Sequence, residues 1–462
     1  MPASRASGVV DVEWLIAALG RAAADAGVDA YIAGGFVRDR LRGRPGRDLD
    51  LVVLGRPGGT AALLRRLAVI LGWPEPELFE AYGTGKAAGD GFVVEAVEAR
   101  VEEYDAGSRR PRVRPGTLEE DVWRRDFTVN TLLQTFGGQV LDLTGRGLRD
   151  LVAGVLRTPL DPSRAFEDDP LRMLRAARFA SVLDARADDQ LLAAMRERAS
   201  RVELLSAERV RDELRGLLRG RRPSRGIEVL REGSLLGRLL PELEAMRGVE
   251  QSGWHTHDVY GHTLAAVDGA PPDLVTRAAV LLHDVGKPPC HAIDERGRHT
   301  FHDHPQVGAE MAERLLARLS WPADETAEVT ALIRLHLRPI QYDAGQTGDS
   351  AVRRLIRDAG ALRSRMLDVA RADIRASAYP TTAGIDELAE RMERLDGDGA
   401  VSARRRVLDG SALMREFGRG PGPWIGAAQR ALEEAVVEGE VRTDDAEGAL
   451  RWLRERRPDL VG

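Results

Sequence analysis

Two carboxylates stand one residue apart in an otherwise apolar run, Asp48-Leu49-Asp50. On a β-strand, residues i and i+2 point to the same face, so both carboxylates should project together while Leu49 turns into the core. Carboxylates are costly on a buried strand unless they are paired or bind a metal, and two like charges so close repel unless a cation lies between them. Since Mg²⁺ prefers carboxylate and water oxygens, the pair is a candidate magnesium site, with a solvated strand edge as the alternative.

A glycine pair lies shortly before these acids. Gly34 and Gly35 follow a short apolar strand and precede a helical stretch that carries Arg38. Glycines let backbone N–H groups approach a phosphate closely, and the start of a helix adds a favourable dipole. An ordinary strand–turn–helix connection explains this stretch taken alone, but together with the acid pair it favours a triphosphate site.

A third acid is expected on a neighbouring strand. Glu95, in Phe92–Val97, is the best candidate and Glu98 is the second choice. Three carboxylates, Asp48, Asp50 and Glu95, holding two Mg²⁺ ions fit nucleotidyl transfer. One ion would activate the attacking hydroxyl and the other would hold the triphosphate and the leaving pyrophosphate.

The composition limits the possible classes of protein. The 462 residues are 43% apolar and 5% aromatic, which predicts about two to four domains with aliphatic cores. With no signal peptide, no apolar run of about 18 residues and one cysteine, Cys290, we expect a cytoplasmic protein without membrane contact, disulfide framework or Cys-based zinc cluster. The net charge of −6 argues weakly against nucleic-acid binding, but the cations are almost all arginine, with lysine only at Lys86 and Lys287.

Further motifs follow in order: RRDFTVNTL (Arg124–Leu132), DDPLRMLRAARF (Asp168–Phe179) and SAERVRDEL (Ser206–Leu214). With GGFVRD and DLD, they resemble the bacterial tRNA nucleotidyltransferase and poly(A) polymerase family of the polymerase-β-like superfamily, over about residues 30–245. The resemblance implies template-independent addition of C and A to the 3′ end of tRNA from CTP and ATP. It assigns Mg²⁺ to Asp48 and Asp50, and nucleotide binding to Gly34, Gly35, Arg38, Arg125 and Asp126.

The DDPLRMLRAARF motif suggests how a base is selected. Asp169, Arg172, Arg175 and Arg178 are spaced by three in an expected helix over 168–178, so they should form one slowly drifting stripe. A carboxylate beside a guanidinium can match a base edge, and the resemblance implies that this stripe selects C or A. The family usually has Glu-Asp before the proline, where this chain has Asp168-Asp169. A salt-bridged surface helix is the alternative.

All nine histidines lie between His255 and His336, which marks one module with its own chemistry. His283 and Asp284 end an apolar helix, and the order H…HD…H…H…D resembles the HD phosphohydrolase superfamily. The resemblance implies core metal ligands at His262, His283, Asp284 and Asp373, with His304 and His336 for a second ion or a phosphate. Imidazole and carboxylate ligands suit Ni²⁺, Mn²⁺, Fe²⁺ or Zn²⁺. Lys287 could bind phosphoester oxygens, and the other histidines are expected in loops; a metal-free scaffold that binds tRNA is the alternative.

The elements that must position these residues predict an α+β chain. A mixed α/β palm, with a small mixed sheet and helices, occupies 1–150. An all-helical neck and body (151–250), a helical HD domain (251–396) and a helical tail (397–462) follow. Arginines that could contact tRNA cluster at Arg109, Arg110, Arg112 and Arg114, and at Arg215, Arg219, Arg221, Arg222 and Arg225.

Two alternatives stay open at this point. The family often follows DxD with a Thr/Ser-rich turn, whereas Leu51–Gly55 follows here, so a CC-adding or A-adding enzyme, or a poly(A) polymerase, is credible. A metal-dependent phosphohydrolase whose front half only binds tRNA belongs to a different class. The sequence does not give the oligomeric state.

Overall fold

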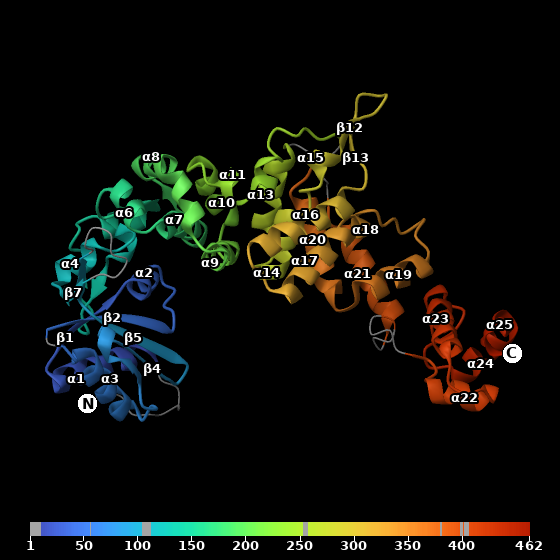
Figure 1. Ribbon diagram of the computed structural model, residues 1–462, viewed down its shortest axis with the longest axis horizontal. Coiled ribbons are helices and arrows are strands. Elements are labelled where there is room, and N and C mark those ends of the chain that lie inside the picture. Colours follow the sequence, from blue (N-terminus) through green and yellow to red (C-terminus); the bar gives the residue numbers. More distant parts are fainter. Residues whose placement is uncertain are drawn as a thin grey trace. The chain divides into compact units, whose positions relative to one another are not determined.

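The computed structural model describes residues 11–55, 57–103, 112–252, 257–378, 381–397, 401 and 406–462. The chain divides into two compact units. The first comprises Met1–Leu204 and Glu232–Ser234, and the second comprises Leu205–Arg231 and Leu235–Gly462 (Figure 1).

The first unit is built on a mixed seven-stranded sheet with the order β3-β4-β5-β2-β1-β8-β9. β2 pairs in parallel with β5 and antiparallel with β1, so the DLD strand lies in the middle of the sheet. The strands are β1 (Asp29–Ala33), β2 (Asp48–Leu54), β3 (Glu77–Phe79), β4 (Thr84–Gly89), β5 (Phe92–Glu98), β8 (Leu133–Gln134) and β9 (Val140–Leu141), with a separate hairpin of β6 (Arg100–Glu103) and β7 (Arg112–Pro115).

The two faces of β2 differ because side chains alternate along a strand. Leu49, Leu51 and Val53 are buried in a core with helices α1 (Val12–Ala26) and α3 (Gly59–Leu71), which lie side by side on one face of the sheet in Figure 1. Asp48 and Asp50 point to the opposite face, where they are exposed. The packing of the apolar residues therefore decides which face the acids take.

Short elements lie between and after the strands of the sheet, and the neck helices come last. They are α2 (Gly35–Leu41), α4 (Leu118–Trp123), η2 (Thr128–Asn130), α5 (Gly147–Ala153), β10 (Val155–Leu156), α6 (Pro162–Asp168), α7 (Leu171–Leu183), β11 (Arg186–Ala187), α8 (Asp189–Arg198) and η3 (Ala199–Leu204). The prediction of one helix over 168–178 is wrong: α6 ends at Asp168 and α7 begins at Leu171. Asp169 between them is extended, with φ −142° and ψ 103°, as expected of a residue before proline.

The second unit is almost entirely helical, and its only sheet among the described residues is the hairpin of β12 (His291–Ile293) and β13 (His299–Phe301). Within 406–462, where the tail is described, it holds α22 to α25. No helix in the described ranges has the length and apolar character needed to cross a membrane. The helices are α9 (Ala207–Leu218), α10 (Pro223–Glu232), α11 (Leu236–Leu239), α12 (Pro241–Glu244), α13 (Val259–Gly269), α14 (Leu274–Leu282), α15 (Lys287–Cys290), α16 (His304–Arg318), α17 (Ala323–Leu335), α18 (Leu337–Ile340), α19 (Asp349–Ala359), α20 (Arg363–Arg375), α21 (Ala383–Asp396), α22 (Gly410–Phe417), α23 (Pro423–Glu438), α24 (Ala446–Arg456) and α25 (Pro458–Val461).

The expected α+β fold class is confirmed, with a mixed sheet first and helices after it. The expectation that His291 and His299 lie in loops is wrong, because both belong to the β12–β13 hairpin. The four domain boundaries stay a prediction.

Candidate active site and metal centre

The predicted acids meet on one face of the sheet. In the parallel pairing of β2 with β5, Asp50 lies opposite Glu95, and both side chains are exposed. Lys86 lies opposite Glu95 on β4, with its Nζ 3.5 Å from Glu95 Oε1. Glu98, the second choice, serves elsewhere: its Oε1 accepts hydrogen bonds from the N–H groups of Gly58 (2.8 Å) and Thr60 (3.4 Å) at the start of α3.

Crowding of the acids changes the acidity of Asp50. Partial loss of water raises its pKa most; Glu95 and Asp48 raise it further, and Arg125 and Arg38 only partly offset them. A divalent cation relieves such repulsion, and carboxylate oxygens are the donors that Mg²⁺ takes in proteins. The donor set of Asp48, Asp50 and Glu95 therefore fits Mg²⁺.

Gly34 lets the backbone pass directly beside these acids. Its φ of 66° lies in the region that favours glycine. A Cβ at this position would stand 3.1 Å from Arg125 Nη1 and 3.5 Å from Asp50 Oδ2. A side chain would thus enter the space between a guanidinium and a carboxylate.

Arg38 and Arg125 are held by the protein itself. Arg38 is 6% exposed and donates from Nε and Nη2 to Asp39 (2.9 and 2.7 Å) and from Nη1 to Asn130 Oδ1 (2.6 Å). Arg125 donates from Nε and Nη2 to Asp121 Oδ2 (3.1 and 2.8 Å) and from Nη1 to the Asn130 carbonyl (3.1 Å). Both cations are therefore fixed in place.

Sequence reasoning missed Asp121 and Asn130, which hold these arginines. A signal existed for both. Asp121 precedes Arg125 by one helical turn, and Asn130 follows Asp126 by the same interval. The Asn130 amide joins the two groups, since its Oδ1 accepts from Arg38 and its Nδ2 donates to Asp126 Oδ1 (2.9 Å).

Asp126 and Arg175 form a clamp between the RRDFT motif and α7. Arg175 donates to Asp126 Oδ2 from Nε (2.9 Å) and Nη2 (2.5 Å). Burial opposes ionisation of Asp126, but Arg175 and hydrogen bonds from Asn130 and Phe127 outweigh it and hold its pKa below the ordinary value. Arg175 and Arg178 also lie near the Phe179 ring, at 5.4 and 4.7 Å from its centroid.

Replacing Arg175 by methionine should lower the free energy of unfolding by about 2–3 kcal/mol, because Asp126 loses its charged hydrogen-bond donor. Urea unfolding would measure the loss. Arg172→Met is the control: its Nη2 donates only to the Arg124 carbonyl (2.8 Å), and we expect a loss of about 1 kcal/mol or less. An equal loss in both variants would contradict the clamp.

The predicted base-selecting stripe is only partly a helical stripe. Arg172, Arg175 and Arg178 lie on α7, but Asp169 precedes the helix, and its Oδ1 accepts a hydrogen bond from the Leu171 N–H (3.1 Å). Arg172 reaches the Arg124 carbonyl in the RRDFT motif. The two motifs predicted to bind the nucleotide are thus in contact.

The second unit gathers six predicted metal ligands in its interior. Two overlapping sets, His262/His283/Asp284 and Asp284/His304/His336, have ligand atoms within 4.8 Å of one another, and Asp284 belongs to both. Asp373 completes the cluster, with its Oδ1 2.9 Å from His262 Nε2 and its Oδ2 3.9 Å from His283 Nε2. Every one of these side chains is buried.

Three of the imidazoles have a defined tautomer. The Nδ1 atoms of His283, His304 and His336 lie 2.7–2.8 Å from the carbonyls of Val280, Phe301 and Ile333. A carbonyl can only accept, so Nδ1 carries a hydrogen and Nε2 of each ring faces the cluster, the orientation of metal-binding histidines.

The cluster also leaves polar atoms for a ligand. Among the described residues, His283 Nε2 and both Asp284 oxygens are buried without a well-directed hydrogen bond. Burial opposes charging of His283, but Asp284 and Asp373 outweigh it and raise its pKa to about 9, whereas burial and His283 lower the pKa of His336 to about 4. Imidazole and carboxylate donors arranged in this way fit a divalent transition metal.

Lys287 and Gly286 shape the edge of this cluster. Lys287 Nζ lies 2.8 Å from Asp284 Oδ2 and donates to Gln251 Oε1 (2.5 Å). A Cβ on Gly286 would stand 2.3 Å from the His304 carbonyl oxygen, so only glycine lets the His283-Asp284 turn approach α16 this closely.

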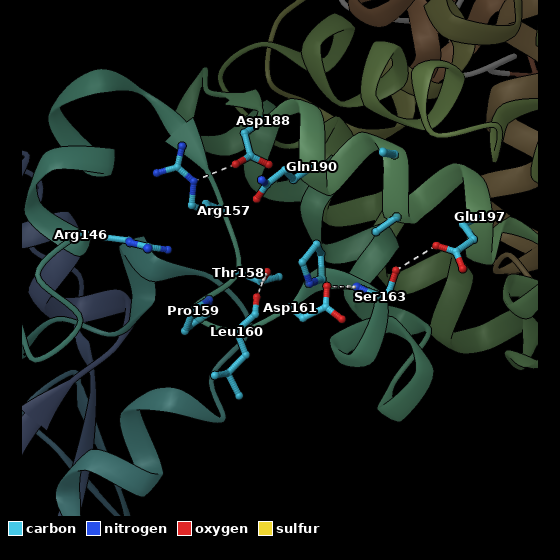
Figure 2. Close-up of a pocket in the computed structure, with 13 residues that line it drawn as sticks. Arg146, Arg157, Thr158, Pro159, Leu160, Asp161, Ser163, Asp188, Gln190 and Glu197 are labelled. Atoms are coloured by element: carbon cyan, nitrogen blue, oxygen red, sulfur yellow. Dashed lines mark hydrogen bonds and ion pairs between the residues drawn. The ribbon is translucent and has the colours of Figure 1, made fainter.

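A cavity of about 560 Å³ in the first unit contains none of the predicted site residues (Figure 2). On its wall, Arg157 donates from Nε to Asp188 (2.7 Å) and from Nη1 to Asp150 (3.1 Å). Asp150 accepts from Thr128 Oγ1 (2.7 Å), and the Arg157 carbonyl accepts from the Thr128 N–H (2.8 Å). Asp150 and Arg157 therefore hold Thr128 of the RRDFT motif in place by hydrogen bonds.

Three arginines of the predicted basic clusters form ion pairs with described acids. Arg109 and Arg110 lie outside the described residues. Arg114 pairs with Glu120, Arg215 with Glu325 and Arg222 with Asp268. Arg219 and Arg221 are exposed and have no ion pair with a described residue.

Three family models match the chain in order. They are the poly(A) polymerase head domain over residues 30–157, a probable RNA- and SrmB-binding site of polymerase A over 187–247, and the HD domain over 256–377. The nucleotidyltransferase and HD families are both metal-dependent.

Similar proteins carry three different names. An A-adding tRNA nucleotidyltransferase of Deinococcus radiodurans is 34% identical, covering 92% of this chain and 96% of that protein. A CC-adding tRNA nucleotidyltransferase of Thermus thermophilus is 33% identical over 94% and 96%. A multifunctional CCA protein of Verminephrobacter eiseniae is 35% identical over 88% and 98%.

Solved structures share the fold. The CCA-adding enzyme of Bacillus stearothermophilus in complex with CTP aligns with a TM-score of 0.67 at 21% identity, over 97% of this chain and all of that one. A tRNA nucleotidyltransferase with a primer tRNA and an ATP analogue aligns with a TM-score of 0.55 at 22% identity, over 82% and 99%. With its head, RNA-binding and HD domains in this order, the chain belongs to the tRNA nucleotidyltransferase family.

Proposed function

We propose that this protein adds C and A to the 3′ end of tRNA without a template, using CTP and ATP and releasing pyrophosphate. The observation that carries the proposal is the register of β2 and β5, which brings Asp50 opposite Glu95 on the face that also presents Asp48. The backbone at Gly34 passes beside Asp50 and Arg125.

The residues of the chain have separable tasks in this reaction. Asp48, Asp50 and Glu95 would hold Mg²⁺, which when bound supplies charge neutralisation as the tRNA 3′-hydroxyl attacks the α-phosphate. Arg38 and Arg125 offer positive charge in fixed positions, so little reorganisation is needed as the pyrophosphate leaves. Gly34 leaves room for a phosphate beside the backbone.

Base selection is proposed for Asp169 and Arg172. Their position where the RRDFT motif meets α7 supports this role, since Arg172 contacts the Arg124 carbonyl. Asp126 and Arg175 would act as positioning residues, because their ion pair joins the RRDFT motif to α7. Arg178 lies over the Phe179 ring, and Arg38 lies 5.1 Å from the centroid of the same ring. We therefore propose that Arg178 extends the nucleotide site.

The number of nucleotides added is decided by a simple assay. Purified protein with Mg²⁺ and tRNA ending before the CCA should extend the tRNA by three nucleotides when CTP and ATP are both present, and by two with CTP alone. Denaturing gels of labelled tRNA resolve these products. The same assay would be run with both nucleotides on tRNA that ends before the CCA and on tRNA that ends after CC. If only C or only A is added, the protein has a partial activity and the proposal is wrong.

A partial activity is the second candidate, because relatives of equal similarity are named A-adding and CC-adding. Leu51, Val52 and Val53, which follow the acid pair, are buried strand residues and offer no hydroxyl to the site. A purely A-adding enzyme should extend tRNA that ends in CC with ATP, and should leave tRNA lacking all three nucleotides unchanged.

For the second unit we propose hydrolysis of a phosphoester, such as a 2′,3′-cyclic phosphate or a phosphomonoester, at the end of damaged tRNA. His262, His283, Asp284, Asp373, His304 and His336 would hold divalent transition metal, which when bound supplies Lewis acidity toward the phosphoester. Lys287, fixed by Gln251 and Asp284, would place positive charge at the edge of the site. Exposed Arg219 and Arg221 are proposed to contact the tRNA backbone.

A further inference from the structure

The β12–β13 hairpin presents four side chains on one face. In its antiparallel register, His291 lies opposite Phe301 and Ile293 lies opposite His299. Residues directly opposite and residues two apart share a face, so these four project together, while Ala292 and Thr300 project to the other side. Ile293 is 62% exposed and His291 is also exposed, which is unusual for such a face.

Two of the rings form one flat surface. The planes of His291 and His299 differ by 9°, and His291 Nε2 lies 2.7 Å from His299 Nδ1. Stacked rings cannot approach closer than about 3.5 Å, so these two imidazoles meet edge to edge in a hydrogen bond. The Phe301 ring packs against the face of His291, with an inclination of 25° and 5.4 Å between the ring centroids, and so supports the flat pair from one side.

This surface is continuous with the proposed HD metal site. The Phe301 carbonyl accepts the hydrogen bond from His304 Nδ1 (2.8 Å). Lys287 Nζ lies 5.5 Å from the centroid of the Phe301 ring and 2.8 Å from Asp284 Oδ2. The Lys287 ammonium group thus lies beside both the Phe301 ring and the carboxylate shared by both ligand sets, where it could meet a phosphate of a nucleotide whose base lies on the hairpin.

We propose that the flat surface of His291 and His299, supported by Phe301, stacks the terminal nucleobase of an RNA whose 3′-end phosphate occupies the HD site. Base–aromatic stacking is tolerant of sequence, because every base has a π-face, so the platform would accept any tRNA end. The inference rests on the HD hydrolysis proposed above and specifies its substrate as a nucleoside phosphate rather than a simple phosphomonoester.

The test compares substrates with and without a base. Steady-state hydrolysis of adenosine 2′-phosphate and of 2-glycerophosphate by the Mn²⁺-loaded full-length protein would be measured for the wild type, His291→Ala and His299→Ala. Thr300→Ala, on the opposite face of the same hairpin, is the matched control. We expect KM for adenosine 2′-phosphate to rise about tenfold in the first two variants, with kcat and the kinetics of 2-glycerophosphate unchanged.

Two results would overturn the platform: equal losses on both substrates, which indicate a structural role, or an unchanged KM for the nucleotide. Calorimetry would also measure the binding of adenosine 2′-phosphate to the same proteins, which distinguishes failure of the stacking proposal from failure of the HD proposal. If the wild type hydrolyses neither substrate, the HD proposal fails, and about tenfold weaker binding in His291→Ala would still support the platform. A 3′-phosphorylated RNA oligonucleotide in the same titration shows whether an RNA end is bound as the mononucleotide is.

Discussion

Replacing Asp50 by alanine should lower the rate of CTP and ATP incorporation into tRNA at least about a thousandfold. Asp50 lies between Asp48 and Glu95, so its loss removes the central donor of the proposed Mg²⁺ site and several kcal/mol of charge stabilisation in the transition state. Single-turnover incorporation of labelled nucleotide measures this effect without interference from product release.

Glu75→Ala provides the control for this substitution. Glu75 is an exposed acid in the same unit that pairs with Arg65 at 3.2 Å, and exposed pairs of this kind contribute little to stability. Its rate should stay within a factor of two of the wild type. An Asp50→Ala protein that retains a tenth of the wild-type rate would contradict the proposed metal site, whereas unchanged phosphoester hydrolysis in this variant would show that the two sites work independently.

Replacing Asp284 by alanine should remove bound metal from the second unit and abolish hydrolysis of a 2′,3′-cyclic phosphate. Asp284 belongs to both ligand sets, so no complete set remains. The metal content measured by mass spectrometry and the rate of hydrolysis should fall together, while the rate of nucleotide addition stays within about a factor of two of the wild-type rate.

Single histidine variants test the two ligand sets separately. They also keep Asp284, so Lys287 retains its carboxylate partner. His262→Gln should deplete the first set and His336→Gln the second, each with partial loss of metal. His302→Gln, an exposed histidine outside both sets, should retain the full metal content. Normal metal content in Asp284→Ala would contradict the shared site. A wild-type protein that binds the metal fully but hydrolyses no substrate would indicate that the metal has a structural role.

The chemistry of the front half could be predicted because it depends on local spacing. Strand periodicity put Asp48 and Asp50 on one face, and burial of Leu49, Leu51 and Val53 confirms that division. The position of Glu95 opposite Asp50 depends on the parallel pairing of strands distant in the chain, and no local pattern reports that register.

Other differences trace to signals that were given too little weight. Pro170 disfavours a helical residue before it, which is why Asp169 is extended and α7 starts later than expected. His291 and His299 flank a turn that contains Gly297 with φ 74°, and an alternating pattern around such a turn indicates a hairpin. The Asp121–Arg125 pair is four residues apart and could have been predicted, whereas Asn130 reaches Arg38 only when segments 92 residues apart in the chain meet.

The two lysines of this chain differ in exposure, which allows one of them to be modified selectively. Lys86 contacts Glu95 beside the proposed Mg²⁺ site, and its side chain is 44% exposed, whereas Lys287 contacts Asp284 and is only 9% exposed. All other cationic side chains except histidine are arginines, which do not react as primary amines. An acylating reagent selective for amines would therefore find one accessible lysine in the folded protein, next to the proposed Mg²⁺ site, and the rate at which Lys86 is modified would report on the binding of nucleotide and metal there.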